Sequence, residues 1–224
     1  ILSPTITFCA TFGGKDLRVD WSRDAGNDVP GIVFKDYVVE FSTGGTLRRR
    51  KFTTDLYAEY LYDEQLADLN NVPNRAISVV VKERDAYNRE SADATLAMSN
   101  PTPSAPSFTL NPGFNTVYID ITPSADVDVA GYVVFKGTSP GFTANDASAV
   151  YKGPSPSYTD NNLGEATTYY YKVAAYDQFD NTVATLTISG ELNTTTVTVK
   201  GSIVDFNFEG LELSEAANVV SCPT

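Results

Sequence analysis

Residues 167–181, TTYYYKVAAYDQFDN, decide the fold of this chain. Every second position in the first half of the stretch belongs to one row, which holds Tyr169, Tyr171, Val173 and Ala175. The positions between them form a second row. A period of two in a segment rich in aromatic and β-branched residues is typical of a β-strand and unlike an enzyme motif. The stretch therefore predicts a half-buried central strand.

An offset copy of this stretch occurs earlier, at residues 77–88, ISVVVKERDAYN. Asp85 and Tyr87 of the copy take the places that Asp177 and Phe179 have in the later stretch. A repeated supersecondary landmark of this kind indicates that the chain contains an internal repeat.

Two further landmarks recur in the same order along the chain. The phrase DYVV at residues 36–39 is echoed by GYVV at residues 131–134. The apolar alternation of residues 17–21 is matched by that of residues 117–121. The offsets are roughly 90 to 100 residues, the size of a small β-sandwich domain. The repeat therefore predicts two tandem copies of one all-β domain.

The domain division follows from the composition between the copies. We expect the domains to cover residues 1–99 and 107–195, followed by a C-terminal extension over residues 196–224 that starts a further module. Residues 100–106, NPTPSAP, carry three prolines, which resist both helix and sheet-interior pairing. The sequence predicts a short, stiff linker that holds the two domains end to end.

Alternating apolar positions and turn residues predict the individual strands. In the first domain we expect strands at residues 5–8, 15–22, 34–41, 47–54 and 91–97, and a further strand that begins at Ile77. Residues 57–69 should form a strand followed by a short helical turn near residues 64–69. In the second domain we expect strands at residues 108–110, 116–122, 130–137, 149–152, 157–158, 167–176 and 183–189. Trp21 and Ile121 are expected to be equivalent core residues of the two domains.

Composition excludes several function classes. The 224 residues are 42% apolar and 12% aromatic, as expected for folded β domains. The formal net charge of −12 argues against a nucleic-acid partner. No run approaches the roughly 20 apolar residues of a membrane span, and no signal peptide is recognised. Because the chain starts at Ile1 and not at Met, we expect a fragment of a longer protein or a processed product.

Candidate chemistry is sparse. The chain has no histidine, the commonest general base and metal ligand. Cys9 and Cys222 are expected to lie far apart, so no disulfide is predicted and a reducing cytosol is implied. Acidic residues are plentiful enough to supply a pair for glycoside hydrolysis, although nothing places two of them in one cleft. We predict no catalytic, cofactor-binding or metal-binding residues, and no enzyme.

Two short acidic stretches are candidate calcium sites. Asp126 and Asp128, or Asp160 and Asn162, could supply oxygen ligands, but neither stretch has the full spaced set with its closing bidentate Glu. We expect these side chains to cap turns. Asn193 begins a formal glycosylation sequon, N-T-T, which matters only in a eukaryotic secretory setting.

Residues 48–51, RRRK, form the densest basic run in the chain. One interpretation is an electrostatic contact with an acidic partner or a phosphate. The other, which we favour, is an edge strand whose charges prevent edge-to-edge pairing.

The second half of the chain resembles a fibronectin type III domain. Residues 119–123, IDITP, occupy the second-strand motif in which the family usually has Trp at the position of Ile121. Residues 163–169 match the family's Leu, turn, Thr-x-Tyr signature, with Tyr169 as the tyrosine-corner residue. The resemblance implies two tandem fibronectin type III or immunoglobulin-like β-sandwiches. It also implies that Tyr169 buries its ring between the sheets and pairs its hydroxyl with a backbone acceptor in the turn at residues 163–166.

The first half departs from this pattern at two positions. It keeps Trp21 but has Ile77 where Tyr169 lies, so no tyrosine corner is expected there. Glu83 aligns with the core residue Ala175. A carboxylate at the end of an inward row is tolerable only near solvent, so we expect Glu83 at an exposed end of its sheet.

A narrower resemblance comes from the phrases at residues 126–147, 149–160 and 167–181, together with FGGKD at 12–16 and FKDY at 34–37. They are similar to the fibronectin-like modules of phage tail-tip attachment proteins, the hub and fibre proteins that resemble the lambda host-specificity protein. The phrase FEGLEL near the C-terminus resembles the start of another such module. The resemblance implies location in the virion at the tail tip, and as partners other tail-tip proteins and copies of the chain in a homotrimer. It leaves contact with a host receptor open.

These observations predict a non-catalytic spacer or decoration segment of a phage tail-tip or central tail fibre protein, with no nucleic-acid partner and no membrane span. The alternative is a set of accessory modules from a secreted bacterial carbohydrate-active enzyme or adhesin. Neighbouring tail genes would favour the first, and a catalytic domain in the full gene the second, because fold alone does not decide function.

Overall fold

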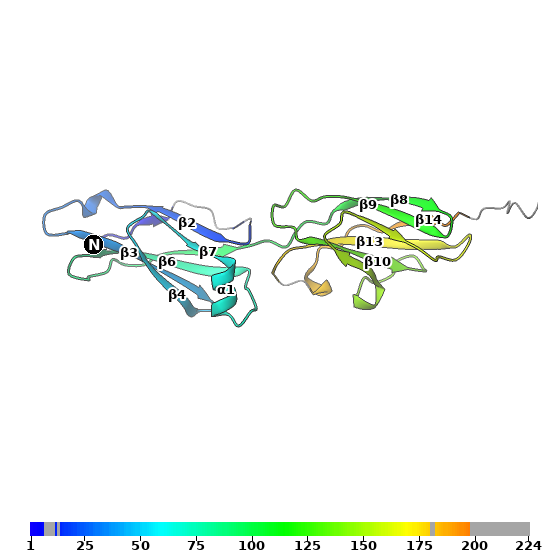
Figure 1. The fold of residues 1–224 in the computed structure, drawn as a ribbon. Helices are drawn as coiled ribbons and strands as arrows, with labels where there is room; N and C mark the ends of the chain where they lie inside the picture. The colour runs from blue at the N-terminus through cyan, green and yellow to red at the C-terminus, as the bar shows by residue number, and fades with distance from the viewer. Residues whose placement is uncertain (7–11, 13, 180–181, 198–224) are drawn as a thin grey trace, which may run out of the picture.

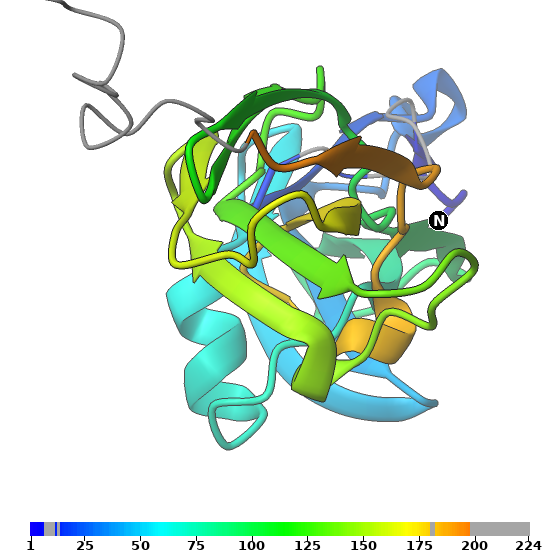
Figure 2. The ribbon, with the colours of Figure 1, turned by 90° about the vertical axis from the view of Figure 1, so that its right-hand side faces the viewer.

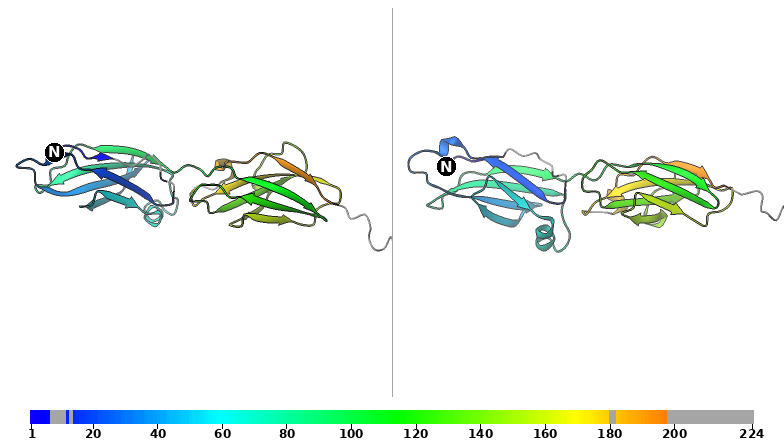
Figure 3. Two further views of the ribbon diagram at one scale, coloured as in Figure 1. Left: turned by 90° about the horizontal axis from the view of Figure 1, so that it is seen from above. Right: turned by 45° about the horizontal axis from the view of Figure 1, so that its top comes forward.

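The computed structural model describes residues 1–6, 12, 14–179 and 182–197. Within these residues the chain forms two β-sandwiches arranged end to end, with the linker between them (Figures 1 and 3). Cys9, Cys222 and the FEGLEL phrase lie outside the described residues. The paired strands in both sandwiches are antiparallel, which confirms the predicted all-β fold class.

The first sandwich consists of a three-stranded and a four-stranded sheet. The three-stranded sheet has the order β1-β2-β5, with β1 at Thr5–Ile6, β2 at Leu17–Ser22 and β5 at Tyr57–Tyr60. The four-stranded sheet has the order β4-β3-β6-β7, with β3 at Phe34–Thr43, β4 at Thr46–Thr53, β6 at Ala76–Asp85 and β7 at Ala94–Ser99. A 3-10 turn, η1 at Ala25–Asn27, and one helix, α1 at Tyr62–Asp68, complete this half.

The second sandwich repeats this order seven strands later. Its three-stranded sheet is β12-β9-β8, with β8 at Ser107–Gly113, β9 at Thr116–Thr122 and β12 at Ser157–Asp160. Its four-stranded sheet is β11-β10-β13-β14, with β10 at Gly131–Gly137, β11 at Ala149–Gly153, β13 at Thr168–Tyr176 and β14 at Leu192–Thr195. Two 3-10 turns are η2 at Asp146–Ser148 and η3 at Val183–Thr185. Figure 2 looks at this sandwich from its far end.

Each sandwich has its own core between its sheets. The inward rows of the alternating strands meet there, as the period of two predicts. The first core includes Trp21 and the second includes Ile121, which are 3% and 5% exposed, so both are confirmed as core residues. The row Tyr171, Val173 and Ala175 also lies in the second core.

Strand β13 is half-buried, as predicted: on its outer face Ala174 is buried, whereas Tyr170, Lys172 and Tyr176 stay partly exposed. On its outer face Ala174 joins Val133, Phe135 and Leu186 in a separate apolar cluster. The covering segment is residues 183–189, which we expected to be the seventh strand. It instead forms η3, whose Val183 packs with Leu186 over the sheet face. Only its last residues reach the edge of β13, through an isolated bridge between Ile188 and Ala174. The seventh strand is β14.

Several element boundaries differ from the predicted ones by one to four residues. The helix α1 begins earlier than the predicted turn at residues 64–69 because its first turn is capped. The Asp16 carboxylate accepts from the Tyr62 amide at 2.7 Å, and the Glu64 carboxylate accepts from the Leu61 amide at 3.0 Å. Acidic groups near exposed helix amides also interact favourably with the helix dipole.

Glu83 is fully buried, which contradicts its expected exposed position. Arg23 donates to its carboxylate through Nε at 3.0 Å and Nη2 at 2.9 Å, and the Asn27 amide donates at 3.0 Å. A buried carboxylate is costly unless it is paired and hydrogen-bonded, and these donors satisfy that condition. The sequence comparison with Ala175 could not identify them because they come from another part of the chain.

The tyrosine corner of the second sandwich is present. The Tyr169 hydroxyl accepts a hydrogen bond from the Gly164 amide at 2.9 Å, within the predicted turn. Two details differ from the expectation: the hydroxyl is the acceptor, and the ring packs against the edge of the core while remaining half-buried.

Candidate functional site

At the junction between the sandwiches, side chains from both halves of the chain converge. Arg75 lies directly before β6, and Asp177 lies directly after β13. The Arg75 guanidinium donates to the Asp177 carboxylate through Nη1 at 2.7 Å and Nη2 at 2.8 Å. The Asp177 side chain is fully buried, and such a bidentate pair constrains both distance and orientation.

Phe179 crosses from the second sandwich into the core of the first. Its ring lies 5.7 Å from the ring of Phe12 and 5.7 Å from the ring of Tyr62, with edge-to-face geometry at both. The Arg75 guanidinium lies 5.2 Å from the same ring. Phe179 is only 6% exposed and belongs to the first core cluster. The first core is therefore completed by a residue of the second sandwich.

A turn after β13 holds Phe179 in position. The Asp177 carboxylate accepts from the Phe179 amide at 2.8 Å, as Asp side chains often do two residues ahead. The earlier copy makes the same turn, since the Asp85 carboxylate accepts from the Tyr87 amide at 2.9 Å. The internal repeat thus preserves this turn in both sandwiches.

Helix α1 contributes a second contact to the junction through its first residue. The Tyr62 hydroxyl donates to the Gln178 carbonyl at 2.6 Å. Burial, followed by the negative charge of Asp177, raises the pKa of Tyr62 above its ordinary value. The hydroxyl therefore stays protonated as a donor across the physiological range.

The linker is bound from both sides. The amide group of Asn100, which is 1% exposed, faces the Phe12 carbonyl at 2.9 Å and the Asp128 carboxylate at 2.8 Å. The Asp126 carboxylate accepts from the Ser104 amide at 2.7 Å. Together these bonds tie the linker to the first sandwich and to the loop between β9 and β10.

The candidate calcium ligands are not brought together into one site. Asp126 and Asp128 hold the linker, while Asp160 binds Lys136 at 2.9 Å and accepts from the Tyr171 hydroxyl at 3.0 Å. Asn162 has a φ of 59° in the following turn. Across the part of the chain that the structure describes, no cluster of three or more His, Cys, Asp or Glu side chains could hold a metal ion.

The basic run lies on β4, at the edge of the four-stranded sheet, which confirms the expected edge position. Its inward-facing members pair with helix α1. Arg49 binds Asp68 at 2.8 Å, and Lys51 binds Glu64 at 2.6 Å. Inward-pointing charges of this kind protect an edge strand and here also dock the helix. The sequon residue Asn193 lies on β14 and is exposed.

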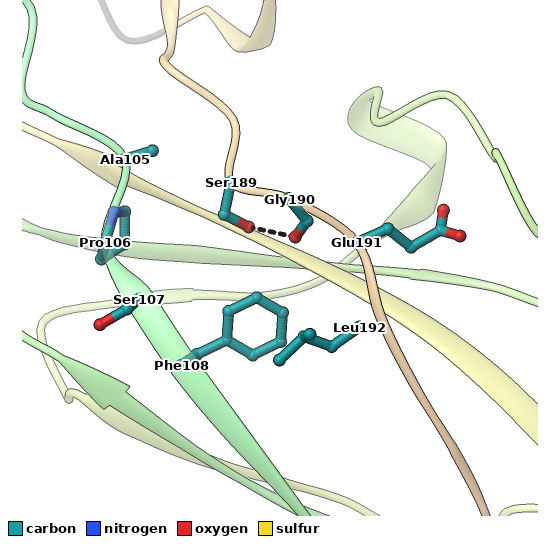
Figure 4. A pocket seen from close by; sticks show the side chains of 8 residues that line it. All are labelled: Ala105, Pro106, Ser107, Phe108, Ser189, Gly190, Glu191 and Leu192. Atoms are coloured by element: carbon teal, nitrogen blue, oxygen red, sulfur yellow. Dashed lines mark hydrogen bonds between the residues drawn. The ribbon is translucent and has the colours of Figure 1, made fainter.

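A groove of about 350 Å³ lies beside the second sandwich, between the start of β8 and the segment that leads into β14 (Figure 4). Phe108 and Leu192 form its apolar floor, and Ser189 donates to the Gly190 carbonyl at its rim. The one acidic lining residue, Glu191, accepts from the Gly141 amide and pairs with Lys172 at 3.5 Å. The lining residues offer no pair of groups for acid–base chemistry.

Sequence reasoning missed the junction as a site. Asp177 and Phe179 carried a signal through the repeat, but Arg75 carried none, because the pair joins residues about a hundred positions apart. The prolines of the linker indicated stiffness without indicating which side chains provide it.

No protein-family model matches the chain, and no curated protein matches it. Among solved structures, the chain is similar to the crystal structure of the chicken CNTN1 FN1–FN3 domains, at 17% identity and a TM-score of 0.38, over 88% of this chain and 68% of that one. It is also similar to a segment of two fibronectin type III domains from chicken tenascin, at 13% identity and a TM-score of 0.42, over 88% of this chain and 99% of that one. Among the described residues, no helix has the length and apolar character needed to cross a membrane.

Proposed function

We propose that this chain is a non-catalytic structural spacer that holds two β-sandwiches in one fixed end-to-end orientation. The observation that carries the proposal is the junction itself. A bidentate Arg75–Asp177 pair and the insertion of Phe179 into the first core restrict rotation about the linker. Contacts that only tethered the two sandwiches would not bury a charged pair and an aromatic ring together.

Rigid orientation is tested by NMR residual dipolar couplings. Both sandwiches should report one shared alignment tensor in the full chain, because they move as one body. Arg75→Ala removes the partner of a buried carboxylate and should give each sandwich its own tensor. Arg50→Ala, which removes an exposed edge-strand pair with Glu40, is the matched control and should leave one tensor. Independent tensors in the unmodified chain would overturn the spacer proposal.

The absence of catalysis is tested with the purified chain on peptidoglycan, polysaccharide and ester substrates. No turnover is expected, because the full sequence has no histidine and the carboxylates of Asp126, Asp128 and Asp177 are engaged in structural hydrogen bonds. Turnover that a single Asp or Glu substitution abolishes would contradict this.

We also propose that the spacer belongs to a phage tail-tip or central tail fibre protein. The support is the resemblance of residues 126–147, 149–160 and 167–181 to modules of that class, together with the tandem β-sandwich fold. Other tail-tip proteins and further copies of the chain in a trimer would be its partners. Gold-labelled antibodies against the chain should decorate the tail tips of virions of the encoding phage. Intact particles that contain none of the chain would exclude this assignment.

A further inference from the structure

The amino-terminal end of the first sandwich repeats the end of the second sandwich that enters the junction. Asp85 and Tyr87 follow β6 as Asp177 and Phe179 follow β13, with the same turn. In Figure 1 the loop after β6 lies at the end of the first sandwich that faces away from the second. Phe179 is 6% exposed, whereas Tyr87 is 73% exposed. The same projecting ring is thus buried at one end and uncovered at the other.

The cation beside the ring is also repeated. The Arg89 guanidinium lies 5.6 Å from the ring of Tyr87, as the Arg75 guanidinium lies 5.2 Å from the ring of Phe179. Arg89 also donates through Nε to the Asp85 carboxylate at 2.6 Å. The first sandwich therefore supplies its own arginine, where the second borrows one from its neighbour. Among the described residues, no pair of aromatic rings encloses Tyr87 as Phe12 and Tyr62 enclose Phe179.

Other exposed apolar side chains lie at the same end of the first sandwich as Tyr87. The Val33 carbonyl accepts from the Ala86 amide at 2.8 Å, so the loop before β3 lies beside the loop after β6. The Asn27 side chain binds the backbone of Leu2 at 2.7 and 2.9 Å, which brings the first residues to the same end. The side chains of Leu2, Val29, Val33 and Tyr87 are 52%, 46%, 59% and 73% exposed. Exposed apolar side chains gathered at one end of a domain are a candidate interaction surface.

We propose that this end, defined by Leu2, Val29, Val33 and Tyr87, is a second module-docking surface. Its occupant is the carboxyl-terminal end of another β-sandwich module, one that presents two aromatic rings around Tyr87 as Phe12 and Tyr62 do around Phe179. The partner needs no arginine at this point, because Arg89 already neutralises Asp85. The inference extends the proposed spacer function from one junction to two, and its geometry rests on the observed junction.

The test adds one module ahead of the full chain. A second copy of residues 1–106 is joined to Ile1, so that its Phe12 and Tyr62 meet Tyr87 of the unaltered chain. Since the core of the first sandwich normally includes Phe179, the copy should fold with Tyr87 in that role. We expect amide hydrogen exchange at residues 86–89 of the downstream chain, and not at those of the added copy, to slow by about tenfold or more relative to the unextended chain. Tyr87→Ala in the downstream chain should remove this protection, whereas Tyr118→Ala, at an exposed tyrosine of β9, should not.

Each other outcome overturns the inference. Unchanged exchange at residues 86–89, or a copy that stays unfolded beside a folded chain, would show that the Tyr87 end cannot replace the Phe179 end. If the Phe179 amide still exchanges slowly in the same sample, the observed junction is intact. The result then contradicts only the proposal for the Tyr87 end and not the spacer proposal. Dimerisation of the unextended chain that Tyr87→Ala abolishes would place a second copy of the chain there and not another module.

Discussion

The two sandwiches share one strand order but close the corner before their sixth strand by different means. In the second sandwich, Tyr169 accepts from the Gly164 amide and the corner is a bare turn. In the first, Ile77 occupies the equivalent position and helix α1 fills the corner. Asp68 of that helix accepts from the Tyr60 hydroxyl and from Arg49, both at 2.8 Å.

This difference shows that the strand order depends on the alternating core rows and tolerates an exchanged corner whose polar groups are paired. It also explains the junction. Because α1 begins at Tyr62, the helix places an aromatic ring and a hydroxyl against Phe179 and Gln178. The corner of the first sandwich, which has no tyrosine at this position, forms part of the surface that contacts the second sandwich.

The largest expected losses of stability come from substitutions in the two cores. Trp21→Ala should lower the free energy of unfolding by about 3 to 5 kcal/mol and Ile121→Ala by about 2 to 5 kcal/mol, the usual cost of large-to-small changes at buried positions. Chemical denaturation followed by circular dichroism measures both. Losses below about 1 kcal/mol at both sites would show that the two positions are not equivalent core anchors.

The next comparison concerns Glu83 and its counterpart Ala175. Arg23→Ala leaves a buried carboxylate with the Asn27 amide as its remaining side-chain donor, and should cost about 3 kcal/mol. Glu83→Ala installs the residue of the second sandwich and should cost less, since Arg23 is partly exposed and still reaches Asp28. The free energies of unfolding of the two variants decide this. A greater loss for Glu83→Ala would contradict the ranking.

Removal of the tyrosine-corner hydroxyl should have a smaller effect. Tyr169→Phe keeps the ring but leaves the Gly164 amide to bind water, which is accessible in this exposed turn. We expect a loss of about 1 kcal/mol, the net value of one hydrogen bond. Tyr118→Phe on the exposed face of β9 is the control for thermal denaturation. If Tyr169→Phe and Tyr118→Phe lowered stability equally, the tyrosine-corner hydrogen bond would not stabilise the fold.

The helical corner should make the first sandwich sensitive to acid. Burial alone would raise the pKa of Asp68, but hydrogen bonds from Arg49 and Tyr60 outweigh it and hold the pKa below its ordinary value. Since the unfolded-state pKa is about 3.9, this stabilisation is present above about pH 4 and is lost as the pH falls through the lower folded-state pKa. The effect should be about 1 kcal/mol or less for a partly exposed pair.

Denaturation of Asp68→Asn between pH 2 and 7 measures this contribution. The variant should show a weaker dependence of stability on pH than the unmodified chain in the acid range. A dependence as steep as that of the unmodified chain would assign the acid sensitivity to other carboxylates.

Much of the fold follows from local patterns in the sequence. The period of two in residues 167–176 predicted a central strand, and the recurrence of Asp and an aromatic residue at 85–87 and 177–179 predicted the internal repeat. The same pattern misassigned residues 183–189, because an apolar alternation that covers a sheet face looks like one that joins its edge. The partners of Glu83 and the Arg75–Asp177 pair leave no local signal, because they depend on how separate segments pack.

The central claim is that the second sandwich completes the core of the first through Phe179. Trp21 is the single tryptophan of the chain and lies in the first core, so its fluorescence during urea denaturation reports the first sandwich alone. Phe179→Ala, a change in the second sandwich, should lower the midpoint reported by Trp21, while Phe114→Ala at an exposed position of the second sandwich should not. A Trp21 midpoint unaffected by Phe179→Ala would contradict the claim.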